Sequence, residues 1–272
     1  MSRPVTLTMN AGVATVTLTQ PEIRNAFSDE VIAEITAAFE TVAQVADVRA
    51  VVLAAEGPAF CAGANLNWMR RMADYSREEN LADAGKLAHM LHTIYTCPLP
   101  TIARVQGDVY AGGMGLVAAC DMAVAVNTAH FCLSEVKIGL VPATIAPYVL
   151  RAMGPRAGHR YFLTGERFDA SEALRMGFIH QVVTTDALDD AVDQLLKHLL
   201  QAGPQAVQAC KKLVLDVAER DINATLIRDT VERIADIRAS SEGKEGVQAF
   251  LGKRKPNWLS CAGVALPRPF RP

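Results

Sequence analysis

The chain has 272 residues, of which 50% are hydrophobic and 21% are charged, and its formal net charge is −2 at pH 7. This composition is that of an ordinary globular protein, and the length is ample for a large buried core. A charge this close to balance, without a run of five like charges, argues against a general nucleic-acid-binding surface, which would carry a basic stripe.

The cysteines form no C-x-x-C pair, and several lie in apolar stretches, so we expect free, buried thiols in a reducing cytoplasm. A zinc site would need clustered Cys and His, which the sequence lacks. The first residues lack the apolar centre of a signal peptide, and no apolar run reaches the ~18 residues of a membrane span. We therefore expect a soluble, cytoplasmic protein. The cysteines are Cys61, Cys97, Cys120, Cys132, Cys210 and Cys261.

The first elements alternate between strand and helix patterns. Residues 12–20 predict a strand with Ala14, Val16 and Leu18 on one face and threonines on the other. Residues 28–45 predict a helix that Ser28 can cap, because apolar residues recur there at helical spacing. These apolar residues are Val31, Ile35, Phe39 and Val42.

Three nearly continuous apolar runs follow, at residues 49–57, 100–107 and 121–127. Such runs suit strands covered on both faces. A helix is predicted between the first two, from about Glu78 to Tyr95. Strands that alternate with helices imply crossover connections and parallel pairing, which is the pattern of an α/β fold.

From Ala146 onward helical patterns dominate. We predict helices over 186–203, 204–220 and 222–240, and a proline-rich, irregular tail from residue 255 to 272. The predicted organisation is an α/β core at 1–200, followed by a helical region with an irregular tail at 201–272. No Ser- or Gly-rich linker separates the two, so they are not predicted to be independent domains.

Two glycine-broken segments carry candidate chemistry. In "GPAFCAGANLNWM" (57–69), Ala62, Gly63 and Ala64 would allow another molecule to approach the backbone. In "QGDVYAGGMGLVAACD" (106–121), a glycine turn precedes a small-residue helix whose N-terminus would favour an anion. The structural alternatives are a plain strand-to-helix connection and close helix packing. The glycines of this segment match neither the dinucleotide-binding motif nor the P-loop in their spacing. Together, two such strand ends could direct two N–H groups at one oxygen, as an oxyanion hole does.

At this point the sequence resembles the enoyl-CoA hydratase/isomerase (crotonase) superfamily, over roughly residues 5–258. The motifs that carry the resemblance, in order, are "QPEIRNAFS", "FCAGANL", "GDVYAGGMGLVAACD", "LSEVKIGLVPA", "LTGERFDASEALRMGFIHQVV" and "EGVQAFLGKRKPNW". The resemblance implies a spiral of ββα turns, a C-terminal helical trimerisation region and an acyl-CoA substrate. It implies that the N–H groups of Ala62 and Gly112 hold the thioester oxygen.

The resemblance also implies a coenzyme A path. Arg24 stands where the family often has a basic residue near the phosphates, and the chain around residues 62–66 would line the adenine and pantetheine. Lys253 has an alternative as a solvated charge beside Arg254 and Lys255. Asn65 stands where many relatives have aspartate. The implied coenzyme A residues are Arg24, Ala64, Asn65, Leu66, Gly113, Phe250 and Lys253.

The implied acid–base machinery is incomplete. Hydratases of the family commonly use two glutamates about twenty residues apart; Glu135 fits the second position, but the first falls on Gly115. Glu135 would then act alone, or with a water or another side chain. A single carboxylate suits a double-bond isomerase, which removes a proton from one carbon and returns it to another. A structural ion pair is the alternative role for Glu135.

Finer resemblance favours bacterial methylglutaconyl-CoA hydratases, which share the glycine, and thus a branched, carboxylated acyl chain. Its far carboxylate would need a cationic or polar partner, for which Lys137, Arg70, Arg71 and Asn67 are candidates. A solvated helix face is the alternative for the two arginines. His89 and His92 are interpreted as surface or hydrogen-bonded helix histidines.

The sequence therefore predicts an enoyl-CoA hydratase with Glu135 as acid–base group. An enoyl-CoA isomerase and a non-catalytic acyl-CoA- or RNA-binding relative remain as alternatives. No metal or other cofactor is expected, since coenzyme A enters with the substrate. The expected assembly is a homotrimer or hexamer, with neither a membrane nor nucleic acid as a partner.

Overall fold

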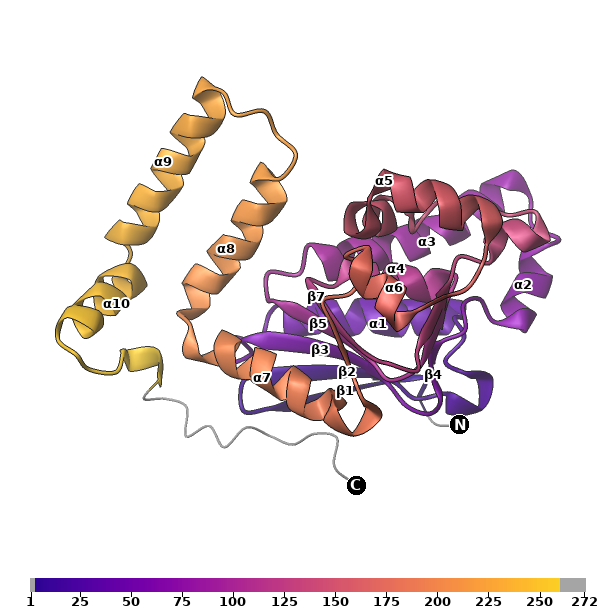
Figure 1. The fold of residues 1–272 in the computed structure, drawn as a ribbon, viewed down its shortest axis with the longest axis horizontal. Helices are drawn as coiled ribbons and strands as arrows, with labels where there is room; N and C mark the ends of the chain where they lie inside the picture. The colour runs from indigo at the N-terminus through magenta and orange to yellow at the C-terminus, as the bar shows by residue number, and fades with distance from the viewer. Residues whose placement is uncertain (1–2, 260–272) are drawn as a thin grey trace.

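A computed structural model gives the fold of residues 3–259, which is built around two β-sheets (Figure 1). The larger sheet has the strand order β1-β2-β3-β5-β7-β10, and the smaller has the order β4-β6-β8-β9. The strands are β1 (Val5–Asn10), β2 (Val13–Leu18), β3 (Ala50–Ala55), β4 (Ala59–Cys61), β5 (Thr101–Val105), β6 (Asp108–Tyr110), β7 (Met122–Val126), β8 (His130–Cys132), β9 (Phe168–Asp169) and β10 (Gln181–Val183).

Successive strands pass from one sheet to the other, which makes the chain a spiral. The pairs β3/β4, β5/β6 and β7/β8 each give their first strand to the larger sheet and their second to the smaller, and a helical segment follows each pair. In the larger sheet, β1 and β2 form an antiparallel hairpin, and every later pairing is parallel. The predicted α/β fold of ββα turns is confirmed.

Several helices begin at a residue whose side chain caps the first turn. The Ser28 side chain accepts a hydrogen bond from the Val31 N–H, so α1 starts as predicted, and Ser76 with Glu79 forms a capping box for α3. The helices are α1 (Asp29–Val42), α2 (Leu66–Met72), α3 (Arg77–Tyr95), α4 (Gly112–Ala119), α5 (Ala146–Thr164), α6 (Ala170–Arg175), α7 (Leu188–Gln201), α8 (Pro204–Val217), α9 (Ala224–Ala239) and α10 (Ser241–Leu251), with short 3₁₀ turns η1 (Pro21–Ile23), η2 (Glu135–Ile138), η3 (Thr185–Ala187) and η4 (Asn257–Leu259).

Burial follows the apolar runs with one exception. All of β3 is buried, as its continuous apolar run predicts. The polar face expected for β2 is wrong at Thr15, which is only 4% exposed. Helix α1 packs against β1 and β2, and α7 packs against β3, β5 and β7, so the larger sheet lies inside the protein.

The C-terminal part is helical, as predicted, but it is preceded by two strands that the sequence did not indicate. Both β9 and β10 are short and pair with strands far away in the chain, β8 and β7. Leu200, at the end of α7, is the last residue of the hydrophobic core, whereas α8, α9 and α10 extend away from it (Figure 1). The division at residues 200 and 201 stays a prediction, and the tail after residue 259 lies outside the described residues.

Four of the cysteines, Cys61, Cys97, Cys120 and Cys132, are free and buried as predicted. The prediction is wrong for Cys210, which is exposed, and Cys261 lies outside the described residues. Between residues 3 and 259, no helix combines the length and the apolar character that crossing a membrane requires.

Candidate active site

The two glycine-broken segments lie against each other, as the sequence predicts. A Cβ atom built on Gly63 would stand 2.9 Å from the Cβ of Ala111, and one built on Gly113 would stand 2.8 Å from the Cβ of Cys61. Real side chains do not approach so closely, so glycine is required at both positions. The ends of β4 and β6 are thereby brought into backbone contact.

Ala64 presents a free backbone N–H at this junction. Ala64 forms a parallel bridge with Phe27, in which the Phe27 N–H donates to the Gly63 carbonyl and the Asn65 N–H donates to the Phe27 carbonyl, both at 2.7 Å. In such a bridge the N–H of the middle residue points away from the partner strand. No residue within 3–259 accepts a hydrogen bond from the Ala64 N–H.

The predicted donor Ala62 differs in this respect. Its N–H donates to the Arg24 carbonyl at 2.9 Å. Because that amide is already used inside the protein, the prediction that Ala62 offers a free N–H is wrong. The physical reason is the two-residue alternation of an extended chain, in which Ala62 faces the neighbouring loop.

The second amide belongs to Gly112, the first residue of α4. The first N–H groups of a helix have no partner within the helix, and no acceptor for the Gly112 N–H is found in the described part of the chain. The preceding Ala111 adopts φ 47° and ψ −121°, which an alanine rarely does. A Cβ on Gly112 would lie 2.6 Å from Cε2 of Phe27. Phe27, which forms the bridge with Ala64, therefore also packs against Gly112.

Glu135 is the first residue of η2 and follows the end of β8 by three residues. The end of β8 is fixed to the glycine turn, because the Ala111 N–H donates to the Cys132 carbonyl at 2.9 Å. The Oε2 atom of Glu135 is buried and has no hydrogen-bond partner among residues 3–259. Burial is the main influence on this carboxyl and raises its pKa, while a hydrogen bond from its own backbone N–H lowers it by less. A carboxyl with a raised pKa and one buried oxygen that no described residue contacts by a hydrogen bond is suited to proton exchange.

At position 115, where the second glutamate is absent, apolar side chains fill the space that a side chain would need. Gly115 is buried in α4, and a Cβ there would lie 2.4 Å from Cγ2 of Ile145 and 3.3 Å from Cδ2 of Leu91. Both neighbours belong to the hydrophobic core. A glutamate side chain at position 115 would have to displace them, so the described site is built around one carboxylate.

The remaining predicted residues near the junction have varied surroundings. Asn65 caps α2, since its Oδ1 accepts hydrogen bonds from the N–H groups of Asn67 at 2.8 Å and Trp68 at 3.4 Å. Leu66 begins α2 and is 69% exposed. Arg24 is exposed and lies in the left-handed region, at φ 52°.

Phe250 and Lys253 are not brought to this site within one chain. Phe250, on α10, is 82% exposed, and Lys253 follows the end of that helix. In Figure 1, α10 lies at the far side of the molecule from α2 and α4.

The candidate partners for a distal carboxylate divide in two groups. Arg71 forms an ion pair with Asp29 at 2.7 Å, and Arg70 donates to Asn67 at 2.7 Å, so these three candidates have local partners. Lys137 lies two residues after Glu135 and has no ion pair or hydrogen bond from its side chain within the described chain.

His89 is a surface histidine, as predicted, and its Nε2 lies 3.4 Å from the exposed carboxylate of Glu40.

Sequence reasoning missed three residues of this region. Ala111 gave no signal, because a positive φ is normally indicated by glycine. Ile145 lies two residues after the motif that contains Glu135, and its contact with Gly115 depends on the tertiary fold. Arg167 lies 5.8 Å above the Tyr110 ring and 3.5 Å from Asp108, next to the glycine turn.

Known proteins resemble the chain along almost its whole length. The sequence profile described as enoyl-CoA hydratase/isomerase matches residues 8–260. The enoyl-CoA hydratase ACTT6 of Alternaria alternata is 34% identical over 253 residues, which cover 91% of this chain and 82% of that protein.

Solved structures agree with this. The crystal structure of an enoyl-CoA hydratase from Shewanella pealeana superposes with a TM-score of 0.91 at 43% identity, covering 94% of this chain and 96% of that one. The enoyl-CoA hydratase of Mycobacterium smegmatis gives 0.90 at 36% identity, covering 95% and 100%. With two strand ends packed through glycines and a half-buried glutamate in the following turn, the chain belongs to the enoyl-CoA hydratase/isomerase family.

Proposed function

We propose that the protein is an enoyl-CoA hydratase in which Glu135 is the acid–base group and the N–H groups of Ala64 and Gly112 bind the thioester oxygen. The observation that carries this proposal is the buried Glu135 oxygen without a partner, fixed through Cys132 to the turn that bears Gly112. The relatives from Alternaria and Shewanella, which are named enoyl-CoA hydratases, support it.

In the proposed reaction the ionised Glu135 takes a proton from water as the water oxygen bonds to the β-carbon. The electron pair of the double bond moves toward the carbonyl, and the resulting enolate oxygen receives the hydrogen bonds of the two amides. The same carboxyl then gives a proton to the α-carbon, which restores Glu135. No metal or redox group takes part in this scheme, and coenzyme A is bound as part of the substrate.

The second candidate is an enoyl-CoA isomerase. Ile145 and Leu91 occupy the space beside Gly115 and leave no room for a second carboxylate there. One carboxylate suffices to remove a proton from one carbon and return it to another, with the same enolate held by the same amides.

For the acyl chain we propose a branched, carboxylated group such as methylglutaconyl. Lys137 is the candidate partner, because it is close in sequence to Glu135 and carries an unpaired charge, whereas Arg70 and Arg71 have local partners. A cation opposite the distal carboxylate would favour such a chain over a neutral one.

A turnover assay tests the function. The purified chain would be incubated with crotonyl-CoA, methylglutaconyl-CoA and a 3-enoyl-CoA, with products separated by chromatography. Hydrated product supports hydratase, and isomerised product without hydration supports the second candidate. Glu135→Gln should lower kcat by about 100-fold or more, because the proton carrier is lost. Glu30→Gln, an exposed glutamate in the first turn of α1, is the matched control.

Unchanged turnover in the Glu135→Gln variant would remove this residue from the mechanism. Absence of turnover with every thioester, together with tight and salt-sensitive RNA binding, would favour the non-catalytic alternative instead.

We also propose that the chain assembles as a homotrimer or hexamer. Apolar side chains are exposed on the helices that extend from the core, which would be costly in a monomer. In such an assembly Phe250 and Lys253 would reach the coenzyme A of a neighbouring copy. The exposed side chains include Val214 on α8, Ile227, Val231 and Ile234 on α9, and Val247, Phe250 and Leu251 on α10.

A further inference from the structure

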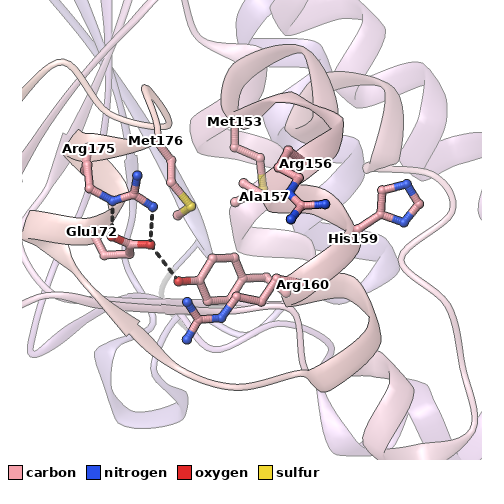
Figure 2. A pocket seen from close by; sticks show the side chains of 9 residues that line it. Met153, Arg156, Ala157, His159, Arg160, Glu172, Arg175 and Met176 are labelled. Atoms are coloured by element: carbon pink, nitrogen blue, oxygen red, sulfur yellow. Dashed lines mark hydrogen bonds and ion pairs between the residues drawn. The ribbon is translucent and has the colours of Figure 1, made fainter.

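A cavity that Glu135 does not line lies between α5 and α6. Its volume is about 570 Å³, which is within the range of small-molecule sites. Figure 2 shows the side chains that line it, in which apolar and cationic residues alternate: Met153, Ala157 and Met176 supply apolar surface, and Arg156, Arg160 and Arg175 supply positive charge.

Two of these arginines are already neutralised. Arg175 donates to both carboxylate oxygens of Glu172, at 2.6 and 2.7 Å (Figure 2). The Tyr161 hydroxyl donates to the same carboxylate at 2.9 Å. These bonds lower the pKa of Glu172 to about 2, so it stays ionised. Arg160 donates to both oxygens of Glu166, at 2.8 and 3.2 Å.

Arg156 is different. It lines the cavity, and its guanidinium has no hydrogen bond or ion pair with any residue in 3–259. Since the other two cations are each matched by a glutamate, the cavity retains the positive charge of Arg156. A guanidinium presents a planar set of donors that fits a carboxylate or a phosphate.

The apolar part of the lining limits the ligand further. Met153 is buried and Met176 is half-buried, and methionine side chains adapt to ligands of varied shape. An inorganic anion would leave this surface in contact with water.

We propose that this cavity binds a small amphipathic anion, whose carboxylate or phosphate pairs with Arg156 and whose hydrocarbon part lies against Met153 and Met176. The site does not include Glu135, Ala64 or Gly112, and it stands independently of the proposed hydratase activity.

Binding to the full chain tests the proposal, with octanoate and octyl phosphate as probes and 1-octanol and inorganic phosphate as controls. Carbon-13 labelling of the methionine methyl groups gives a local signal, because two of the nine methionines line the cavity. We expect saturable shifts of the Met153 and Met176 signals with both amphipathic anions. The tighter of the two identifies the preferred head group, and octanol or phosphate alone should bind at least about tenfold more weakly.

Two variants address the two halves of the site. Arg156→Gln should weaken binding of the anions by about tenfold or more, as calorimetry would measure, while leaving octanol unaffected. Arg228→Gln, an exposed arginine on the distant α9, is the matched control and should change nothing. Ala157→Phe should fill the cavity and abolish binding of both anions.

The proposal is overturned if the Met153 and Met176 signals do not respond, or if Arg156→Gln binds octanoate and octyl phosphate as tightly as the unaltered chain. Equal affinity for inorganic phosphate and octyl phosphate would mean that the hydrocarbon part adds nothing to binding, and would overturn the proposal that the ligand is amphipathic. Should Arg156→Gln fail to fold, the methionine signals and the Ala157→Phe variant decide the matter.

Discussion

At the scale of single residues, the site is defined by groups whose local energy is unfavourable. Glu135 holds a buried carboxyl oxygen without a partner, and Ala111 holds a backbone conformation that suits glycine better. Such features are retained where the surrounding structure fixes them, and they concentrate at functional sites. Each gives a prediction.

The raised pKa of Glu135 predicts how stability depends on pH. Its pKa is higher in the folded protein than in the unfolded chain, where glutamate titrates at about 4.3. Between the two pKa values the folded state binds more protons, so this residue lowers the free energy of unfolding as pH rises through that window. Glu135→Gln should therefore gain stability relative to the unaltered chain between acidic and neutral pH, and lose that advantage below the unfolded pKa.

Urea unfolding at a series of pH values checks this, with Glu30→Gln as control. A Glu135→Gln difference that is constant across pH would contradict the assignment. The same raised pKa predicts that kcat/KM rises with pH until Glu135 is ionised, because the proposed first step needs the carboxylate.

Ala111 predicts a contrast between two substitutions. Ala111→Val places a β-branched side chain at φ 47°, and we expect a loss of about 1–3 kcal/mol in the free energy of unfolding with a fall in kcat/KM. Ala111→Gly fits the conformation and should fold at least as well. Denaturant unfolding and the turnover assay measure both effects, and a valine variant with full stability and activity would refute the role of this turn.

At the scale of elements, local capping contacts start some helices, whereas contacts between distant segments hold others against the core. Ser28 and Ser76 start α1 and α3 through contacts within four residues, and a sequence shows such contacts directly. Helix α8, in contrast, is joined to the core by Lys211. Its Nζ lies 2.7 Å from Asp121 and donates to the Leu99 carbonyl at 3.1 Å, and its side chain is 8% exposed.

Removing this buried cation should leave the Asp121 carboxylate without its ion-pair partner, with only the hydrogen bonds from Thr101 remaining. We expect Lys211→Met to lower the free energy of unfolding by about 3 kcal/mol. Lys212→Met is the control, since that neighbouring lysine is 71% exposed in its pair with Asp216 and should change stability by less than about 1 kcal/mol. Equal effects of the two substitutions in urea unfolding would show that Lys211 does not hold α8.

At the scale of the whole molecule, the exposed apolar side chains of α8–α10 predict self-association. Light scattering should give three or six times the chain mass of 29.3 kDa. Replacing Ile227 and Val231, which are 54% and 59% exposed on α9, by aspartate should shift the mass to a single chain, because buried charges would oppose the contact. An unaltered chain that stays at 29.3 kDa at every concentration would exclude the assembly.

The sequence alone determined the features that depend on near neighbours along the chain. Apolar residues at helical spacing predicted α1, and nearly continuous apolar runs predicted the buried strands β3, β5 and β7, with a helix near α3 between the first two runs. The ordered motifs of the family resemblance implied the α/β spiral and Glu135. These signals are readable because burial and capping act on residues a few positions apart.

Only the tertiary structure decided which atoms are free. It showed that the Ala62 N–H is used by Arg24 while the Ala64 N–H is not, that Ile145 fills the space beside Gly115, and that β9 and β10 complete the sheets. Each of these outcomes depends on contacts between segments far apart in sequence, and hydrogen bonding and close packing at such contacts leave no periodic pattern in either segment.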